Sequence, residues 1–198
     1  MAERKIRIIL GALLCAAFIA SSAYADVSLP RPATGGGDAI YDLLQRRASG
    51  TRDNFPSGAI SDEELSTILW AATGLNRGKA DKAWTVPTAG GLPPYVKIYA
   101  VRKDGVFMYD WKNHALTEIS KNDALGEITS DNFVKAAPIV LILVSETGNL
   151  GAMGKLNAGN ALAYTLAGAM SQNAYLAADA LGISTRYMVS MNADGVAR

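Results

Sequence analysis

A long alanine-rich stretch at residues 157–181 constrains the fold of this chain more than any other part of the sequence. Apolar residues at helical spacing, such as Leu166 and Met170, predict a helix that packs closely on one face. The next three residues, Ser-Gln-Asn, are polar where a plain core helix would be apolar. Gly159 and Gly168 each cost about 1 kcal/mol relative to alanine inside a helix. We therefore expect something to approach this helix closely, either a ligand or another helix, which could belong to a second subunit; we favour the helix.

Residues 1–25 have the organisation of a secretory signal peptide, with a basic start and an apolar run at residues 8–20. Ala23 and Ala25 place small residues at the −3 and −1 positions of a cleavage point before Asp26. The apolar run is shorter than the ~20 residues of a membrane span. We expect cleavage before Asp26, export to a periplasmic location, and no stable membrane anchor.

The only cysteine, Cys15, lies in that apolar run, so the mature chain would contain none. An exported chain without cysteine cannot use disulfides, thiol redox chemistry or cysteine-bound metal. Removing residues 1–25 changes the counts from 19 basic and 18 acidic residues to 16 and 17, which is a net charge of −1. This near-neutral charge gives no indication of nucleic-acid binding.

Residues 26–37 are rich in proline and glycine and predict an extended leader before a single domain at residues 38–198. A first helix is expected to begin after an Asp38 cap and to end at the cations Arg46 and Arg47. Its apolar residues would share one face: Ile40, Leu43 and Leu44.

A second helix has clear start and stop signals. Ser61 and Glu64 form a capping-box pattern, in which each side chain can bond the other residue's backbone amide. Apolar residues then follow helical spacing up to Gly74, a predicted C-cap.

Strand patterns occupy the middle of the chain. Residues 96–101 alternate in polarity, 103–105 form a turn, and 106–109 predict the returning strand of a hairpin. The continuous apolar run at residues 138–144 predicts a central strand buried on both faces. The sequence thus predicts an α+β domain, a sheet covered by helices.

Catalytic side chains are scarce. His114 is the only histidine, and it lies in an apparent surface hairpin end, which disfavours a hydrolase triad. The acidic residues show no metal-ligand spacing. If the chain is an enzyme, we expect a bound organic cofactor to perform the chemistry.

Two segments could anchor such a cofactor. A basic turn could surround a phosphate with charged and hydroxyl donors from Arg46, Arg47, Ser49, Thr51 and Arg52. A loop at residues 87–94 has adjacent glycines that allow close backbone approach to a flat ligand. Either segment alone is more often a solvated helix end or an ordinary loop.

Together these segments resemble, in content and order, the FMN-dependent nitroreductase superfamily, and most closely its SagB-type oxidoreductases. The resemblance extends from about residue 38 to residue 192, and it rests on the segments 46–52, 60–77, 87–90, 105–116 and 168–182. Each segment is loosely matched, but their order is specific.

The resemblance implies an α+β fold with a mixed sheet flanked by helices, and an intertwined homodimer with FMN at each subunit interface. It implies phosphate contacts from Arg46, Arg47, Ser49 and Arg52, of which Arg47 and Ser49 match best. It places a loop from the partner subunit against the isoalloxazine ring, formed by Pro87, Thr88 and Ala89. It places backbone amides near the ring's N5 and O4 edge at Val189 and Ser190.

The implied reaction is hydride transfer through flavin N5 between a donor, expected to be NAD(P)H, and a small organic acceptor. It requires no catalytic side chain and no metal. Nitroaromatic, quinone and peptide azoline acceptors all stay open. Relatives continue through a further C-terminal strand that completes the partner's sheet, and we expect that strand to be missing from a chain that ends at Arg198.

Two alternatives stay open beside this interpretation. The chain could be a degenerate member of the same fold that binds another ligand or no cofactor. It could also be an unrelated exported α+β binding module.

Overall fold

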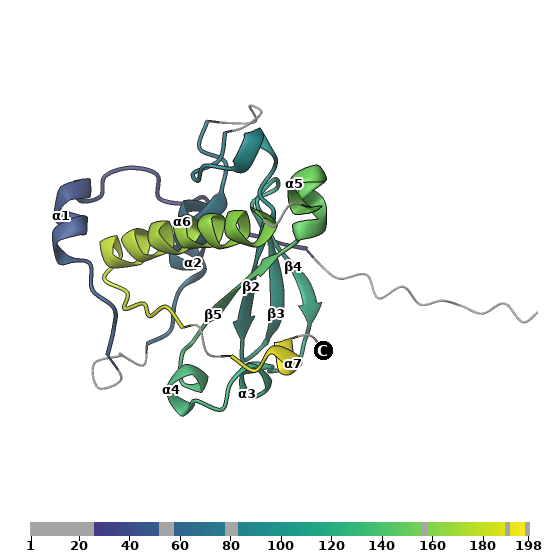
Figure 1. Ribbon diagram of the computed structural model, residues 1–198. Coiled ribbons are helices and arrows are strands. Elements are labelled where there is room, and N and C mark those ends of the chain that lie inside the picture. Colours follow the sequence, from purple (N-terminus) through teal and green to yellow (C-terminus); the bar gives the residue numbers. More distant parts are fainter. Residues whose placement is uncertain (1–25, 52–57, 78–82, 156–157, 189–190, 197–198) are drawn as a thin grey trace, which may run out of the picture.

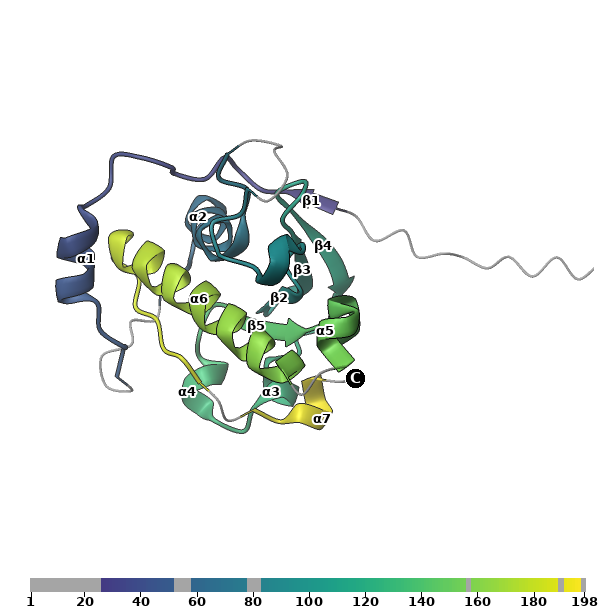
Figure 2. The ribbon, with the colours of Figure 1, turned by 45° about the horizontal axis from the view of Figure 1, so that its top comes forward.

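A computed structural model describes residues 26–51, 58–77, 83–155, 158–188 and 191–196 (Figure 1). The expected signal peptide at residues 1–25 lies outside the described residues. In the described part, a five-stranded sheet carries the two longest helices on one face (Figures 1 and 2). Short helices pack on its other face.

The sheet has the strand order β1-β4-β3-β2-β5. Its strands are β1 Asp26–Ser28, β2 Val96–Arg102, β3 Gly105–Asp110, β4 Ala115–Ser120 and β5 Val140–Ser145. The predicted hairpin is confirmed as β2 and β3. The expectation of a mixed sheet needs correction, because every described pairing is antiparallel. Short turns join β2, β3 and β4 in succession, and short connections of this kind produce antiparallel neighbours.

The prediction that residues 138–144 form a central strand is wrong in position. Strand β5 pairs with β2 alone among the described strands, and so it ends the sheet. Its two faces are nevertheless covered. Leu141 and Leu143 pack with the cluster beneath the long helices, whereas Ile142 packs with Leu125 and Ile128 of the short helices. Burial of both faces explains the unbroken apolar run, which says nothing about a strand's place in the order.

The two longest helices are α2 Asp62–Thr73 and α6 Ala158–Ala180. The predicted capping box is confirmed, since Ser61 Oγ accepts from the Glu64 amide at 3.2 Å and Glu64 accepts from the Ser61 amide at 2.7 Å. Gly74 is the C-cap of α2, as predicted. The two helices pack on the sheet through fully buried side chains, which include Leu65, Leu69, Leu166 and Met170.

The remaining helices are short. They are α1 Ile40–Arg46, η2 Ala89–Gly91, α3 Leu125–Ile128, α4 Asn132–Lys135, η3 Thr147–Leu150, α5 Ala152–Lys155 and α7 Ala193–Val196. Among the described residues, no helix is both long and apolar enough to cross a bilayer.

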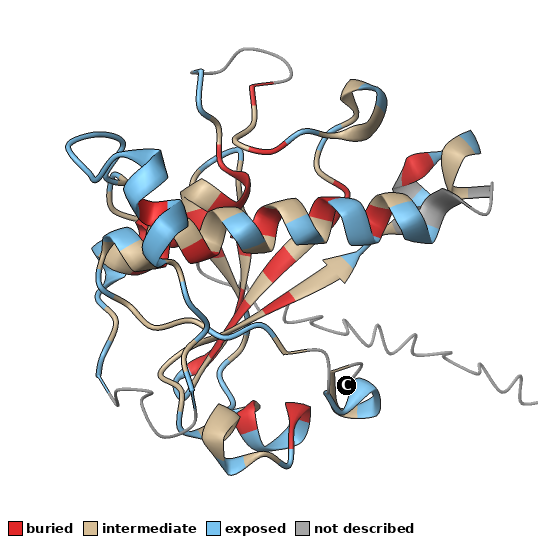
Figure 3. Cartoon of the chain, turned by 60° about the vertical axis from the view of Figure 1, so that its left-hand side comes forward, coloured by how far each residue is buried: buried red, intermediate tan, exposed pale blue. Residues whose placement is uncertain are grey.

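Helix α1 differs from its prediction. Its N-cap is Ala39 rather than Asp38, and no side chain caps it. Leu43 is buried, but Ile40 and Leu44 are about half exposed. Figure 3 shows α1 at the edge of the fold with much of its surface exposed. Of the three apolar residues expected to share one face, only Leu43 is buried.

The leader at residues 26–37 is extended, but it is not separate from the sheet. Its first three residues form β1, which pairs with β4. Thr117 Oγ1 donates to Asp26 Oδ1 at 2.7 Å, and Leu29 packs against the core. Folded structure therefore includes residues ahead of Asp38, the residue at which the sequence predicted that the domain begins.

His114 joins the leader to the domain. Its Nε2 lies 3.1 Å from the Pro30 carbonyl and 2.8 Å from Ser66 Oγ on α2, and its Nδ1 lies 2.9 Å from the Tyr109 hydroxyl. Because a carbonyl only accepts, Nε2 carries the proton and Nδ1 accepts from Tyr109. Burial lowers the pKa of His114. The only histidine is thus a structural group, held neutral between three elements.

This arrangement predicts a stability that depends on pH. Below pH about 6.5 the unfolded chain binds a proton at His114 that the folded chain resists, so the free energy of unfolding should fall as pH falls from about 6.5 towards the lower folded pKa. Urea unfolding of the wild type and of His114→Asn at pH about 7.5 and about 5.5 measures this effect. Asparagine tolerates the left-handed backbone at residue 114, where φ is 51°. Equal loss of stability in both proteins would contradict the prediction.

Candidate functional site

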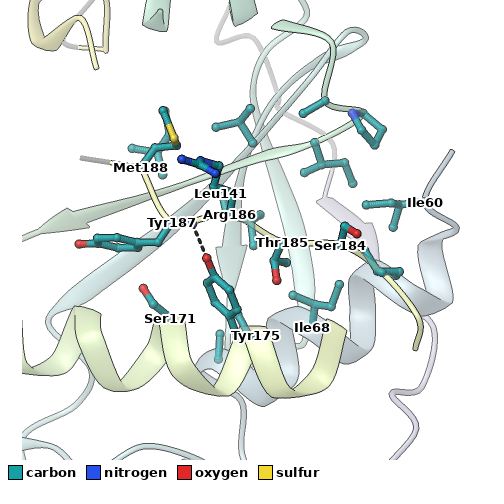
Figure 4. Close-up of a pocket in the computed structure, with 18 of the residues that line it drawn as sticks. Ile60, Ile68, Leu141, Ser171, Tyr175, Ser184, Thr185, Arg186, Tyr187 and Met188 are labelled. Carbon is teal, nitrogen blue, oxygen red and sulfur yellow. Dashed lines mark hydrogen bonds between the residues drawn. The ribbon is translucent and has the colours of Figure 1, made fainter. Parts of the chain in front are cut away.

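A cavity of about 910 Å³ lies between α6, α2, the sheet and the segment that follows α6. We call residues 183–188 the post-helix segment. Most lining side chains are apolar, as at Ile60, Ile68 and Leu141, and Figure 4 shows Ser171 and Tyr175 rising from α6 toward the post-helix segment. The volume is within the roughly 300–1,000 Å³ of small-molecule sites.

The end of α6 forms one wall of this cavity. Gly182 adopts φ +72°, a left-handed conformation that favours glycine. Its amide donates to the Asp179 carbonyl at 3.0 Å, and the Ile183 amide donates to the Ala178 carbonyl at 2.8 Å. This pair of bonds is a Schellman motif, which ends the helix and reverses the chain. The post-helix segment consequently runs back across the cavity.

Tyr175 joins the post-helix segment to the predicted phosphate turn. Its hydroxyl accepts from the Tyr187 amide at 2.5 Å and lies 3.2 Å from Ser49 Oγ. The Arg47 guanidinium lies 5.5 Å from the centre of the Tyr175 ring, a cation–π contact. Two of the predicted phosphate residues, Arg47 and Ser49, therefore meet at a side chain that lines the cavity.

One backbone bond and one bond from the Arg186 guanidinium hold the turn against the same segment. The Gly50 amide donates to the Thr185 carbonyl at 2.8 Å, and Arg186 donates to the Gly50 carbonyl at 2.9 Å. The turn is thus attached to the wall of the cavity on both sides of residue 50.

Arg46 does not join Arg47 and Ser49 at Tyr175. Its guanidinium bonds Asp38 at 2.5 Å and Asp179 at 2.7 Å. Hydrogen bonds to these two carboxylates raise the pKa of Arg46. Within the described chain, Arg46 ties α1 to the C-terminal part of α6. The prediction that it binds phosphate stays a prediction.

The predicted ring-contacting loop lies elsewhere. Pro87 and Thr88 precede η2, and Ala89 begins it. Next to them, Gly90 faces Met153 of α5, at the opposite end of α6 from Tyr175. One copy of the chain therefore does not bring this loop to the turn at Arg47. Three other predicted residues, Arg52, Val189 and Ser190, lie outside the described part of the chain.

Ser171 is a candidate that sequence reasoning did not single out. Its hydroxyl is buried in the cavity wall and has no hydrogen-bond partner among the described residues. Buried polar atoms are normally paired, so the unpaired hydroxyl makes Ser171 a candidate ligand contact. The sequence signal that could have found Ser171 is the polar run Ser-Gln-Asn in the alanine-rich helix.

The neighbouring polar residues have different roles. Asn173 donates to the Ala71 carbonyl at 3.1 Å and to the Thr85 carbonyl at 3.2 Å, so it joins α6 to α2 and to the chain beyond. Gln172 is exposed. Gly168 is also exposed, and a Cβ added there would meet nothing described within 4 Å. The close approach predicted at Gly168 is therefore not made by the described residues of the same chain.

Hydrolytic and metal chemistry find no support in this region. His114 is used structurally, away from the cavity. In the part of the chain that the structure describes, no three acidic, histidine or cysteine side chains gather into a possible metal site.

The fold is an α+β domain with a mainly apolar cavity beside the C-terminal part of its longest helix. A model of the nitroreductase family matches residues 43–198, and the chain belongs to this family. Its α+β class, with helices over a sheet, is thereby confirmed, and membership supports an oxidoreductase fold. Among curated proteins, no sequence match is found.

The solved structures similar to the chain include the following three. A "putative nitroreductase" from Ralstonia eutropha JMP134 is 28% identical with a TM-score of 0.69, over 79% of this chain and 72% of that one. The Escherichia coli microcin synthetase McbBCD complex, with truncated pro-MccB17 bound, contains a chain that is 18% identical with a TM-score of 0.63, over 96% and 77%. A "putative nitroreductase" from Anabaena variabilis ATCC 29413 is 16% identical with a TM-score of 0.56, over 81% and 35%. The last two show the fold alone.

The role of Asn173 can be tested directly. Asn173→Ala leaves the Ala71 and Thr85 carbonyls without their donor, so we expect the free energy of unfolding to fall by about 1–3 kcal/mol. Gln172→Ala, its exposed neighbour on the same helix, should change it by less than about 0.5 kcal/mol. Urea unfolding measures both, and equal effects would contradict the structural role.

Proposed function

We propose that this chain is an FMN-dependent oxidoreductase that transfers a hydride between NAD(P)H and a small organic acceptor. The observation that carries the proposal is the cavity of about 910 Å³ with the orphaned Ser171 hydroxyl in its wall. The turn with Arg47 and Ser49 is joined to this cavity through Tyr175. An apolar chamber with a cation and a hydroxyl next to one of its lining residues suits a flat cofactor that carries a phosphate.

The residues fit the parts of FMN. Arg47 and Ser49 supply a cation and a hydroxyl, the donors that a phosphate requires. The apolar walls suit an aromatic ring system, and the Ser171 hydroxyl can bond one of its polar atoms. The predicted contacts at Arg46, Arg52, Val189 and Ser190 belong to the same proposal.

Bound flavin supplies hydride chemistry that side chains cannot perform. The chain's own part is to hold the ring against apolar walls, keep water from its face and fix its orientation. No titratable side chain of the cavity has to act as an acid or base, which agrees with a lining that is mainly apolar.

A homodimer is part of the proposal. The loop at Pro87, Thr88 and Ala89 is remote from the cavity of its own chain, so it could reach a cavity only in a second copy. The exposed surface of α6 supports this, because Tyr164 is 78% exposed and Gly168 leaves room for close packing. A second copy there would supply the helix that the sequence predicts.

Two finer points also remain proposals. The order of the sequence segments supports a SagB-type oxidoreductase, without specifying the acceptor. The basic start, short apolar run and small residues before Asp26 support export to the periplasm.

A second candidate is a degenerate family member without a cofactor. It is favoured by Arg46, whose charge is already paired with Asp38 and Asp179. That pairing leaves fewer donors for a phosphate.

The first experiment compares the two candidates. Protein that begins at Asp26, purified after expression with ample flavin, should be yellow and release about one FMN per subunit on denaturation. Arg47→Ala should lose most of this flavin, whereas Arg31→Ala, an exposed arginine of the leader, should keep it. Folded, colourless wild-type protein that cannot be reconstituted would support the degenerate member instead.

The Ser171 hydroxyl gives a second test. If it bonds the cofactor, Ser171→Ala should weaken FMN binding by roughly tenfold, the effect of one buried hydrogen bond. Thr165→Ala removes a hydroxyl on the same helix that bonds the Ala161 carbonyl and is exposed. Fluorescence titration should show unchanged binding for Thr165→Ala, and unchanged binding in both variants would remove Ser171 from the site.

A further inference from the structure

Tyr175 occupies the junction between the two chain segments that the proposed function assigns to FMN. Its ring lies on the inner side of α6 with only 9% of the residue exposed. Its hydroxyl reaches the post-helix segment at Tyr187 and the basic turn at Ser49 (Figure 4 shows the first bond). No other described side chain hydrogen-bonds to both segments.

The directions of these two hydrogen bonds follow from the chemistry of the groups. A backbone amide can only donate, so the Tyr175 oxygen accepts from Tyr187. A phenol has a single proton, and the remaining partner is Ser49 Oγ at 3.2 Å. Either oxygen can donate in this bond; because the buried Tyr175 proton has no other partner among the described residues, we take Tyr175 as the donor and the exposed Ser49 oxygen as the acceptor.

This direction leaves the proton of Ser49 available. Ser49 is exposed, on the same turn as Arg47, whose guanidinium lies 5.5 Å from the centre of the Tyr175 ring. The three donors form a chain from the Tyr187 amide through the Tyr175 hydroxyl to the Ser49 hydroxyl. Hydrogen bonds aligned in one direction polarise one another, which makes the last hydroxyl a better donor to an anion.

We infer that Tyr175 is a positioning residue that directs the Ser49 hydroxyl toward the phosphate of the cofactor and fixes the turn relative to the post-helix segment. The inference rests on the proposed function. It assigns to Tyr175 a specific role in discriminating phosphorylated from unphosphorylated flavin. Tyr175 itself need not touch the phosphate.

The test compares FMN with riboflavin, which has the same ring system and no phosphate. Tyr175→Phe removes one oxygen and keeps the ring under Arg47. We expect its affinity for FMN to fall about tenfold, and its affinity for riboflavin to fall far less, so that the preference for FMN shrinks. Tyr41→Phe is the control, because Tyr41 is a tyrosine of α1 that is 80% exposed and does not line the cavity. It should leave both affinities unchanged.

A double-mutant cycle with Ser49→Ala tests whether Tyr175 acts on FMN binding through Ser49. If Tyr175 acts through Ser49, the loss in the double variant should be close to that of Ser49→Ala alone. Additive losses, or equal weakening of FMN and riboflavin in Tyr175→Phe, would overturn the positioning role and leave only a packing role. Thermal unfolding of each variant, recorded without ligand, shows whether the fold is retained.

Different results would contradict the role of Tyr175 and the proposed function. Wild-type protein that binds FMN while Tyr175→Phe keeps the full preference for FMN contradicts the role of Tyr175 alone. Folded wild-type protein that binds neither flavin contradicts the proposed function, and the role of Tyr175 with it.

Discussion

The packing of α6 against α2 and the sheet is the interaction on which the rest of the structure depends. Leu166 and Met170 are 1% and 0% exposed, and they fix the helix on the sheet through its middle turns. Burying each such side chain contributes roughly 1.5–3 kcal/mol. Because the helix is rigid, this packing also sets the position of every other side chain that it carries.

The other side chains of α6 point in several directions. Asn173 is directed toward α2, where it bonds two backbone carbonyls. Ser171 and Tyr175, one turn apart, face the cavity. Gly168 is exposed and does not line the cavity. A single helix thereby provides core, interior polar bonds, a cavity wall and an outer surface, which explains why its sequence is neither uniformly apolar nor simply amphipathic.

Sequence patterns predicted the local structure well where a local interaction decides it. The capping box at Ser61 and the hairpin from Val96 are formed within a few residues of sequence, and both are confirmed. The patterns gave wrong predictions where contacts between distant segments decide the structure. The apolar run of β5 reported burial of both faces, but its edge position depends on which strands pair. Asp38 suited a cap, yet it is paired with Arg46 across α1, in a cluster completed by Asp179 of α6.

The sequence by itself determined the α+β class, the main helices and the turn that carries Arg47 and Ser49. These follow from periodicity, capping and charge, which act over short distances along the chain. Only the tertiary structure decided that Arg47 and Ser49 meet Tyr175, that Arg46 is paired away from them, and that Ser171 is buried without a partner. Such facts depend on contacts between residues more than a hundred positions apart, as at Ser49 and Tyr175, and spacing in a sequence holds no record of them.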